Sequence, residues 1–290
     1  MKKSLIALSS ALAFSVAVGA VPLSDYTTPQ TVLAAPYQVA TSSETITADG
    51  YGRYPAGMPA SIAKIQARRA AVVDAQRNLL ESIKGVAIDS ETTVENFMLK
   101  NDVIHSKVSG IIKGAQVISE EALPDGYKVT VAIPVYGVDS VSDVAITAVV
   151  GDKAPVPVPQ PSPNYKPSVA ISGGYSGLVI NAKGKELVRT FCPAIYDTTG
   201  RAIYGVYNVD KKYAIDYGVV GYAKGPEGWG KVKAGTSRAG TNPLVINAVS
   251  VRERTVNKCD VVISVEDADR ILAENARSHF LDKYAVMFEI

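Results

Sequence analysis

The chain has 290 residues, of which 47% are hydrophobic and 20% are charged. It is long enough for one large domain or two ordinary ones, and too apolar to be disordered throughout. The formal net charge is +2, from 30 basic and 28 acidic side chains. This balance of interspersed signs creates no general field for phosphates, which argues against nucleic acid as a partner.

The first 34 residues have the pattern of a secretory leader. Lys2 and Lys3 form a basic start, and the apolar run from Leu5 to Ala20 is shorter than the ~20 residues that span a bilayer. Cleavage is expected after Ala20 or Ala34; an uncleaved anchor helix is the alternative. No cysteine lies directly after the run, at the position where a lipid would be attached. We therefore expect an exported protein of the periplasm or cell surface, without a lipid anchor and with no membrane span after cleavage.

Proline divides the rest of the chain. The segment GDKAPVPVPQPSPNYKPS, residues 151–168, contains six prolines. Proline fixes φ and lacks an N–H donor, so this segment is predicted to be an extended linker; a ligand for a proline-reading domain is the alternative. The predicted fold class is α+β. It comprises an N-terminal βααββ domain over 41–150, with two helices on an antiparallel sheet, then the linker, then a strand-dominated C-terminal α/β domain over 169–290.

Before the linker, the residue pattern predicts a strand, two helices and further strands. The first strand covers Thr45 to Tyr51, and a helix begins around Pro59 and ends at Gly85. A second helix is expected from Asp89 or Ser90 to about Val108. Strands over 111–120 and 127–136 are joined by the turn LPDG, because Pro and Gly suit a tight hairpin. The brief apolar run over 144–150 is also predicted to be a strand.

The first helix is amphipathic in an unusual way. At 100° per residue its large apolar side chains share one side, which we expect to pack on the sheet, while its alanines lie opposite, near the second helix. Arg69 and Gln76 fall inside the apolar stripe. They are predicted to be interior polar residues that need partners, which for Arg69 are strand-end carbonyls or a carboxylate such as Glu95 or Glu120. An anion-binding Arg69 is the functional alternative, and Arg68 is expected to be solvated.

These stretches carry a family resemblance. The phrases ITADGYG, ARRAAVVDAQRNLLESIKGVAIDSETTVEN and GIIKGAQVISEEALPDGYKVTVAIPVYG, within residues 44–137, resemble the LPP-twenty lipoprotein family, which is related to the N-terminal domain of flagellar assembly protein T. The resemblance implies the α+β fold and suggests a flagellar association. It implies no catalytic residues. The chain lacks the acylated cysteine of the lipoprotein members, so outer-membrane anchoring is not implied.

After the linker, short strands predominate. They are expected over 177–182, 192–196, 202–207, 244–252, 260–265 and 284–290, with a short helix near 210–217 and an amphipathic helix over 266–278. The segment DTTGR, residues 197–201, is predicted to be the turn of a hairpin between the strands over 192–196 and 202–207. Cys192 and Cys259 flank predicted strands; in an exported chain they are either a disulfide or two buried thiols.

Motifs for catalysis, cofactors and metals are weak. GPEGWGK, residues 225–231, has the glycine and lysine spacing of a phosphate loop, but Val232 replaces the Ser or Thr that binds magnesium. Nucleotide binding is therefore not expected, and the segment is predicted to be a glycine-rich surface loop. His105 and His279 lack metal-like spacing and are each expected near a helix C-terminus. We predict no catalytic residues, no cofactor and no metal.

Tyrosines gather in the C-terminal half. Tyr204, Tyr207 and Trp229 are the candidate binding face, because such rings have an apolar surface and a hydrogen-bonding edge; ordinary strand packing is the alternative. The sequence therefore predicts a non-enzymatic cell-envelope protein that acts as an assembly or interaction module, with envelope proteins or cell-wall material as partners. The alternative is an envelope glycan- or ligand-binding protein that uses this face.

Overall fold

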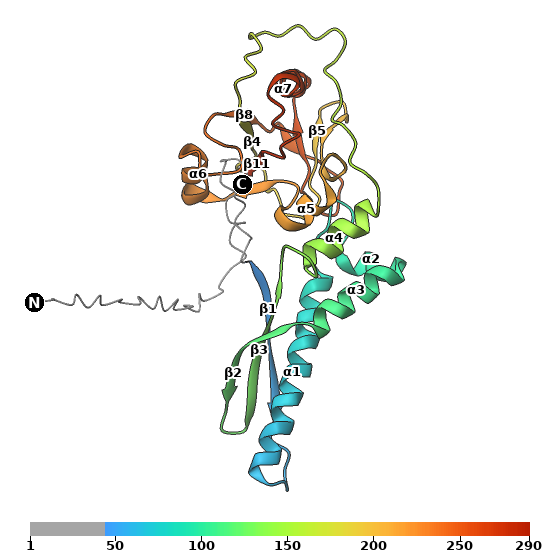
Figure 1. Ribbon diagram of the computed structural model, residues 1–290, viewed down its shortest axis with the longest axis vertical. Helices are drawn as coiled ribbons and strands as arrows, with labels where there is room; N and C mark the ends of the chain where they lie inside the picture. The colour runs from blue at the N-terminus through green and yellow to red at the C-terminus, as the bar shows by residue number, and fades with distance from the viewer. Residues whose placement is uncertain (1–43) are drawn as a thin grey trace, which may run out of the picture.

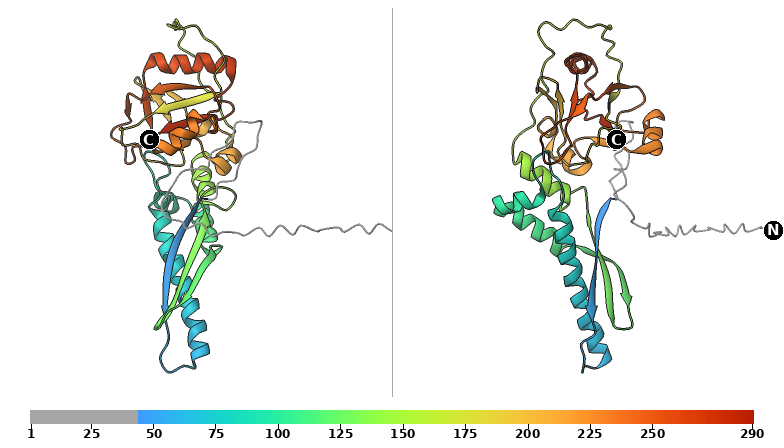
Figure 2. Two further views of the ribbon diagram at one scale, coloured as in Figure 1. Left: turned by 90° about the vertical axis from the view of Figure 1, so that its left-hand side faces the viewer. Right: turned by 180° about the vertical axis from the view of Figure 1, so that it is seen from behind.

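The computed structural model describes residues 44–290, so the predicted leader and its cleavage sites lie outside the described residues. The described chain is a mixed α+β fold with two parts (Figure 1). A slender arm, made of the first long helix and three strands, extends from a globular part that holds the C-terminal half. In both views of Figure 2 the arm stands clear of the C-terminal strands and helices.

The arm contains a three-stranded antiparallel sheet. β1 (Thr45–Arg53) and β2 (Gln116–Ala122) are its edges, and β3 (Gly126–Pro134) is central. The predicted hairpin is confirmed, since the Leu123 N–H donates to the Gly126 carbonyl at 2.9 Å. α1 (Ala60–Lys84) covers one face of the sheet and has the predicted bounds. The other face is polar: on it, Asp49 pairs with Lys128 at 2.8 Å and accepts from Thr130 at 2.6 Å.

The face of α1 that meets the sheet is the alanine face, which corrects the prediction from the helical wheel. Its buried residues recur at every fourth position: Ala63, Ala67, Ala71, Ala75, Leu79 and Ile83. These small side chains let the helix backbone approach β1 at two glycines. A Cβ on Gly50 would lie 2.7 Å from Ala75 Cα, and one on Gly52 would lie 2.8 Å from Ala71 N. Neither glycine has positive φ, so each is required for close approach and not for its backbone conformation.

The polar residues on α1 also differ from prediction. Arg69 is exposed and Gln76 is half-buried, so neither is an interior polar residue that requires a buried partner. Ile62 and Ile65, expected on the sheet, are 47% and 54% exposed. Arg68 is exposed, as expected, and it forms the ion pair with Glu120 of β2 that was considered for Arg69.

The predicted second helix is two helices. α2 (Val94–Lys100) ends at Asn101, whose side chain then caps α3 (Asp102–Lys113) by accepting from the Val103 N–H at 2.9 Å. His105 is therefore near the N-terminus of α3, and its predicted place at a helix C-terminus is wrong. α3 also includes 111–113, which were expected to begin a strand.

The run over 144–150 belongs to a helix and not to a strand. α4 (Val141–Val150) begins at Ser140, whose side chain accepts from the Asp143 N–H at 3.1 Å. α4 is buried along most of its length. It connects the arm to the C-terminal half, since the Ser142 hydroxyl donates to the Ala214 carbonyl at 3.2 Å. Main-chain bonds from Gly137 to Ile215 and from Cys192 to Ile88 add to this junction.

The C-terminal half contains two four-stranded sheets. One is parallel, in the order β7 (Gly221–Ala223), β11 (Val286–Glu289), β4 (Gly177–Asn181), β8 (Pro243–Asn247). The other is mixed, in the order β6 (Ala202–Tyr204), β5 (Ile195–Asp197), β10 (Val261–Ile263), β9 (Ser250–Val251). The shorter helices are η1 (Val206–Asn208), α5 (Lys211–Tyr217) and α6 (Gly225–Lys233), and the longest is α7 (Val265–Ser278).

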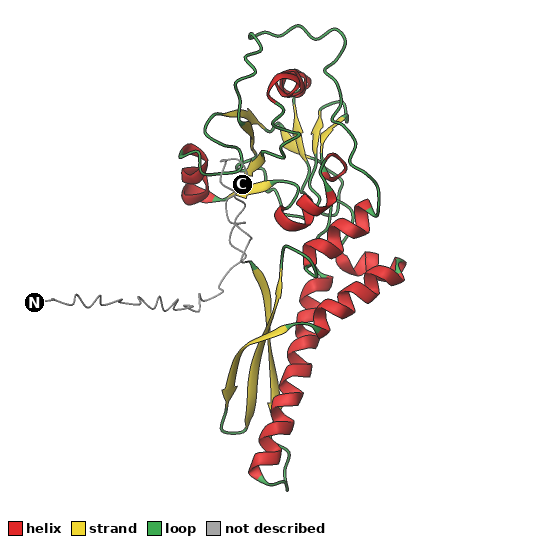
Figure 3. Cartoon of the chain, in the orientation of Figure 1, coloured by secondary structure: helices red, strands yellow, loops and turns green. Residues whose placement is uncertain are grey.

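The proline-rich segment forms part of a strap, residues 151–176, that has neither helix nor strand (Figure 3). It does not hold the two halves apart, because it lies along α7 instead. The Ser162 N–H donates to Asp269 at 2.9 Å, and the Ser172 and Gly173 N–H groups donate to Glu274 at 3.0 and 2.7 Å. Arg201 pairs with the same Asp269 at 2.8 Å. Carboxylates of α7 therefore replace the sheet partners that this proline-rich chain cannot have.

Within residues 44–290, no helix combines the length and the apolar character needed to cross a membrane.

Candidate functional site

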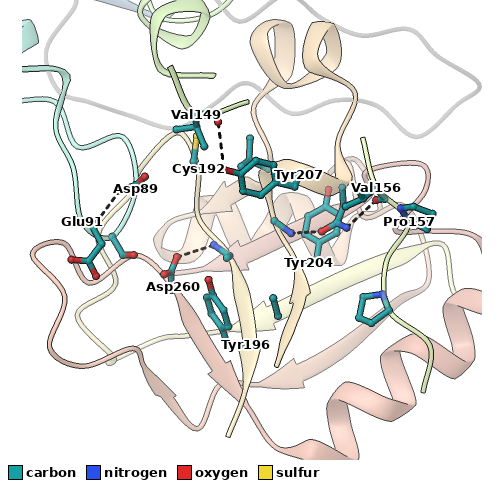
Figure 4. Close-up of a pocket in the computed structure, with 17 residues that line it drawn as sticks. Asp89, Glu91, Val149, Val156, Pro157, Cys192, Tyr196, Tyr204, Tyr207 and Asp260 are labelled. Carbon is teal, nitrogen blue, oxygen red and sulfur yellow. Dashed lines mark hydrogen bonds between the residues drawn. The ribbon is translucent and has the colours of Figure 1, made fainter. Parts of the chain in front are cut away.

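A pocket of about 470 Å³ lies where the loop over 89–91, the end of α4, the strap and the C-terminal half meet. Figure 4 shows Asp89, Glu91 and Asp260 on one side of it and Val156 and Pro157 of the strap on the other. The lining comes from five stretches of the chain: residues 89–91, the end of α4, the strap, β5 with the residues just before it, and β6 with η1. Asp260, which directly precedes β10, completes it. Its volume is in the range of small-molecule sites.

Residues 89–91 reach the pocket because the C-terminal half holds their backbone. The Asn257 side chain donates to the Asp89 carbonyl at 2.8 Å, and the Asn257 N–H donates to the Ser90 carbonyl at 2.9 Å. The Asp89 carboxylate in turn accepts from the N–H groups of Glu91 and Thr92, both at 2.9 Å. This Asx-type turn keeps the loop compact and directs the Glu91 side chain to solvent at the pocket edge.

Asp260 is the most buried carboxylate of the pocket, at 3% exposure. It accepts from the Ala194 N–H at 3.0 Å, and the Arg252 guanidinium lies 3.8 Å from its other oxygen. Arg252 also stacks on the Tyr196 ring at 4.7 Å. Burial raises the pKa of Asp260, although hydrogen bonds from Ser90 and Ala194 and the charge of Arg252 oppose the rise.

The two cysteines lie beside Asp260 as free, buried thiols, which is the second of the two alternatives drawn from the sequence. Cys192 lines the pocket, and the Cys259 thiol lies 3.5 Å from Asp260. Burial raises the pKa of both thiols well above the usual range. Because the thiolate is the reactive form, this environment makes neither cysteine a nucleophile at neutral pH.

The strap side of the pocket is held by hydrogen bonds at a single residue. The Val156 N–H donates to the Tyr207 carbonyl at 2.8 Å, and the Asn208 side chain donates to the Val156 carbonyl at 3.0 Å. Pro157 and Pro159 then line the pocket without needing sheet partners for their nitrogens. The strap therefore forms a wall of the pocket.

The structure separates the three residues of the predicted tyrosine-rich face. Tyr204 is 1% exposed, and its hydroxyl donates to the Val219 carbonyl at 3.2 Å, so it is a core residue that reaches the pocket with one side. Tyr207 is 47% exposed and lies at the pocket. Trp229 lies on α6 and packs against a separate small apolar cluster. The proposed face of all three residues is therefore wrong, and only Tyr207 and Tyr204 share a site.

Other sequence motifs have structural roles. GPEGWGK forms most of α6, so the expected surface loop is wrong. His279 is the C-cap of α7, in the left-handed conformation, as expected near that helix end. Its Nδ1 lies 2.9 Å from Asp282. Among residues 44–290, no group of three or more His, Cys, Asp or Glu side chains could hold a metal ion.

Sequence reasoning missed Asp89, Glu91 and Asp260 as pocket residues. One local signal was present: Asp260 directly precedes the apolar run VVI, and a carboxylate at the start of a buried strand requires hydrogen-bond donors. No local signal joins it to Asp89, which lies 171 positions earlier in the chain. Only the packing of the two halves brings these residues together.

Comparison with known proteins gives one family match. Residues 177–289, which comprise the C-terminal half from β4 onward, match a family model described as the second domain of Treponema pallidum Tp0624. The C-terminal half is thus similar to a domain that recurs in another protein. No curated protein matches the chain.

Proposed function

We propose that this chain is an exported, non-enzymatic cell-envelope protein that acts as an assembly or interaction module. The arm is the observation that carries the proposal. A single helix covers one face of its sheet, and the arm extends away from the globular part (Figure 1). Large apolar side chains are at least one-third exposed along it: Tyr51, Met58, Ile62, Ile65, Val73, Val117 and Ile118. Such side chains on an extended element provide contact area for another protein.

The two edges of the arm sheet differ in a way that favours β2 as the contact edge. Along β1, side chains of α1 satisfy backbone groups: the Tyr51 N–H donates to Asp74 at 2.9 Å and Asn78 donates to the Asp49 carbonyl at 2.8 Å. All seven residues of β2 are exposed. An exposed edge strand is a site where an extended segment of a partner can pair, and the charge of Glu121 disfavours pairing with a second copy of the same edge.

Site-specific photo-cross-linking in intact cells tests this function. A photoreactive residue at Ile65 or Ile118 is expected to give cross-links to envelope proteins, whereas one at Val245, 46% exposed on β8, is the matched control. Cross-links from the control position alone, or none from the arm, would contradict the proposal. Flagellar association is a narrower form of the same function, and normal swimming of a deletion strain would remove it.

Ligand binding is a second candidate function, and the pocket described above, here called the junction pocket, favours it. The pocket has apolar walls, a few convergent polar groups and a buried carboxylate, which is the composition of small-molecule sites. It replaces the tyrosine-rich face as the place where a ligand, including a cell-wall fragment, would bind. Ala202 lines the pocket and is exposed, so Ala202→Trp fills the space without disturbing the core. A ligand found by thermal-shift screening should lose its stabilising effect in this variant.

A further inference from the structure

The junction pocket has an excess of negative charge. Asp89, Glu91 and Asp260 line it, whereas no lysine, arginine or histidine does. Cations lie beside two of the lining residues. Arg252 lies 3.8 Å from Asp260, and Lys153 lies 5.8 Å from the centre of the Tyr207 ring. The Glu91 carboxylate has no ion pair or hydrogen bond among residues 44–290 and is exposed at the pocket edge.

The rest of the lining suits a ligand that has an apolar stem and a cationic group able to stack on an aromatic ring. Tyr196 lies beside Asp260, and its ring already carries one guanidinium, that of Arg252, at 4.7 Å. A ring that binds a cation within the protein is able to bind one from a ligand. Away from the carboxylates the walls are mostly apolar: Val149, Val156, Pro157, Pro159, Ala202 and Val206.

We propose that the pocket binds an organic monocation, an ammonium or guanidinium group carried on an apolar stem. The charged group would lie among Glu91, Asp260 and the Tyr196 ring, and the stem along the strap and Tyr207. A free amine and a lysine or arginine side chain of a peptide share this chemistry. The inference rests on the second proposed function, ligand binding in the pocket, and adds the class of ligand.

Calorimetric titration of the mature chain with three probes of similar size tests the charge requirement. Benzylamine is expected to bind saturably, benzyl alcohol at least about tenfold more weakly, and benzoate not at all, because charge-assisted hydrogen bonds contribute most of the difference. Nα-acetyl-lysine methylamide distinguishes the sources. Tighter binding of this compound than of benzylamine assigns the site to a peptide side chain, and weaker binding assigns it to a free amine.

Variants with opposite expected effects locate the binding. Glu91→Gln, at an exposed position that folding does not depend on, should weaken benzylamine binding about tenfold. Arg252→Gln removes the competing cation and should strengthen it. Glu121→Gln, on β2 of the arm, should leave it unchanged. Asp260→Asn should also weaken it, and Glu91→Gln serves if that variant does not fold.

The results separate this inference from the function on which it rests. Equal binding of benzyl alcohol and benzylamine, with both lost in Ala202→Trp, would overturn the cation class and leave ligand binding in place. Weaker binding after Arg252→Gln, or unchanged binding after Glu91→Gln, would overturn the assignment of the charged group. Binding of no probe, together with no hit in the thermal-shift screen, would overturn both.

Discussion

Replacing Gly50 by alanine puts a methyl group against the backbone of α1. Its Cβ would lie 2.7 Å from Ala75 Cα, about 1 Å inside the ~3.5–4.0 Å optimum for two carbons. The obstructing atoms are main-chain atoms, so no rotamer change relieves the clash. The helix must move away from β1, and the contacts of Ala71 and Ala75, both 0% exposed, are lost with it.

We expect Gly50→Ala to destabilise the arm by about 3 kcal/mol, the upper end of the usual cost of overpacking. Without the clash, the same change would stabilise a strand by ~0.5–1 kcal/mol, because alanine loses less conformational entropy than glycine. The sign of the effect therefore reports the helix–strand distance directly.

Hydrogen exchange is the suitable assay, because the single tryptophan, Trp229, lies outside the arm. Amides of β1 and α1 should exchange roughly a hundredfold faster in Gly50→Ala. Gly110→Ala is the matched control. Gly110 lies in α3 with nothing within 4 Å of an added Cβ, so this variant should be stabilised by ~0.5–1 kcal/mol. Unchanged exchange in Gly50→Ala would refute the close approach of α1 to β1.

Three further predictions concern a cap, the strap and the buried carboxylate. Asn101→Ala removes the N-cap of α3 and should cost about 1 kcal/mol, measured by hydrogen exchange of its first turn; Asn101→Asp should retain most of it. Burial opposes ionisation of Asp269, but hydrogen bonds from Arg201 and Ser162 outweigh it and lower the pKa. Its stabilising effect is therefore present above its unfolded pKa of ~3.9 and is lost as pH falls through the lower folded pKa. Pepsin cleavage of the strap should consequently rise below about pH 4, and the strap of the Asp269→Asn variant should be cleaved at every pH tested. For Asp260 the folded pKa is raised by burial, so its contribution is complete below the unfolded pKa and lost as pH rises through the folded pKa. Asp260→Asn should consequently gain Tm relative to the parent protein between pH 3.5 and 7, and a constant difference would contradict the raised pKa.

Elements with local signals could be predicted from the sequence. Pro59 and Gly85 bound α1, LPDG forms the hairpin, and Ser264 caps α7 by accepting from the Asp267 N–H at 3.0 Å. Each signal acts within a few residues, through a fixed φ, a tight turn or one capping bond.

Elements whose signals compete were predicted less well. The run over 144–150 is rich in β-branched residues, which favour strands, but the Ser140 cap and burial against the C-terminal half make it a helix. Likewise, Asn101 interrupts a continuous helical pattern because its side chain satisfies the first N–H groups of α3. Tertiary context decides such cases, since the local preferences differ by little.

By itself, the sequence determined where α1 and α7 begin and end, the hairpin, and the position of the proline-rich segment. Only the tertiary structure decided which face of α1 is buried, because alanine has little apolar area to mark it and the deciding factor is the glycines of β1 that meet it. The same holds for the pocket. Asp89, Val156 and Asp260 come together through the packing of separate segments, and contacts between residues so distant along the chain leave no period or spacing in the sequence.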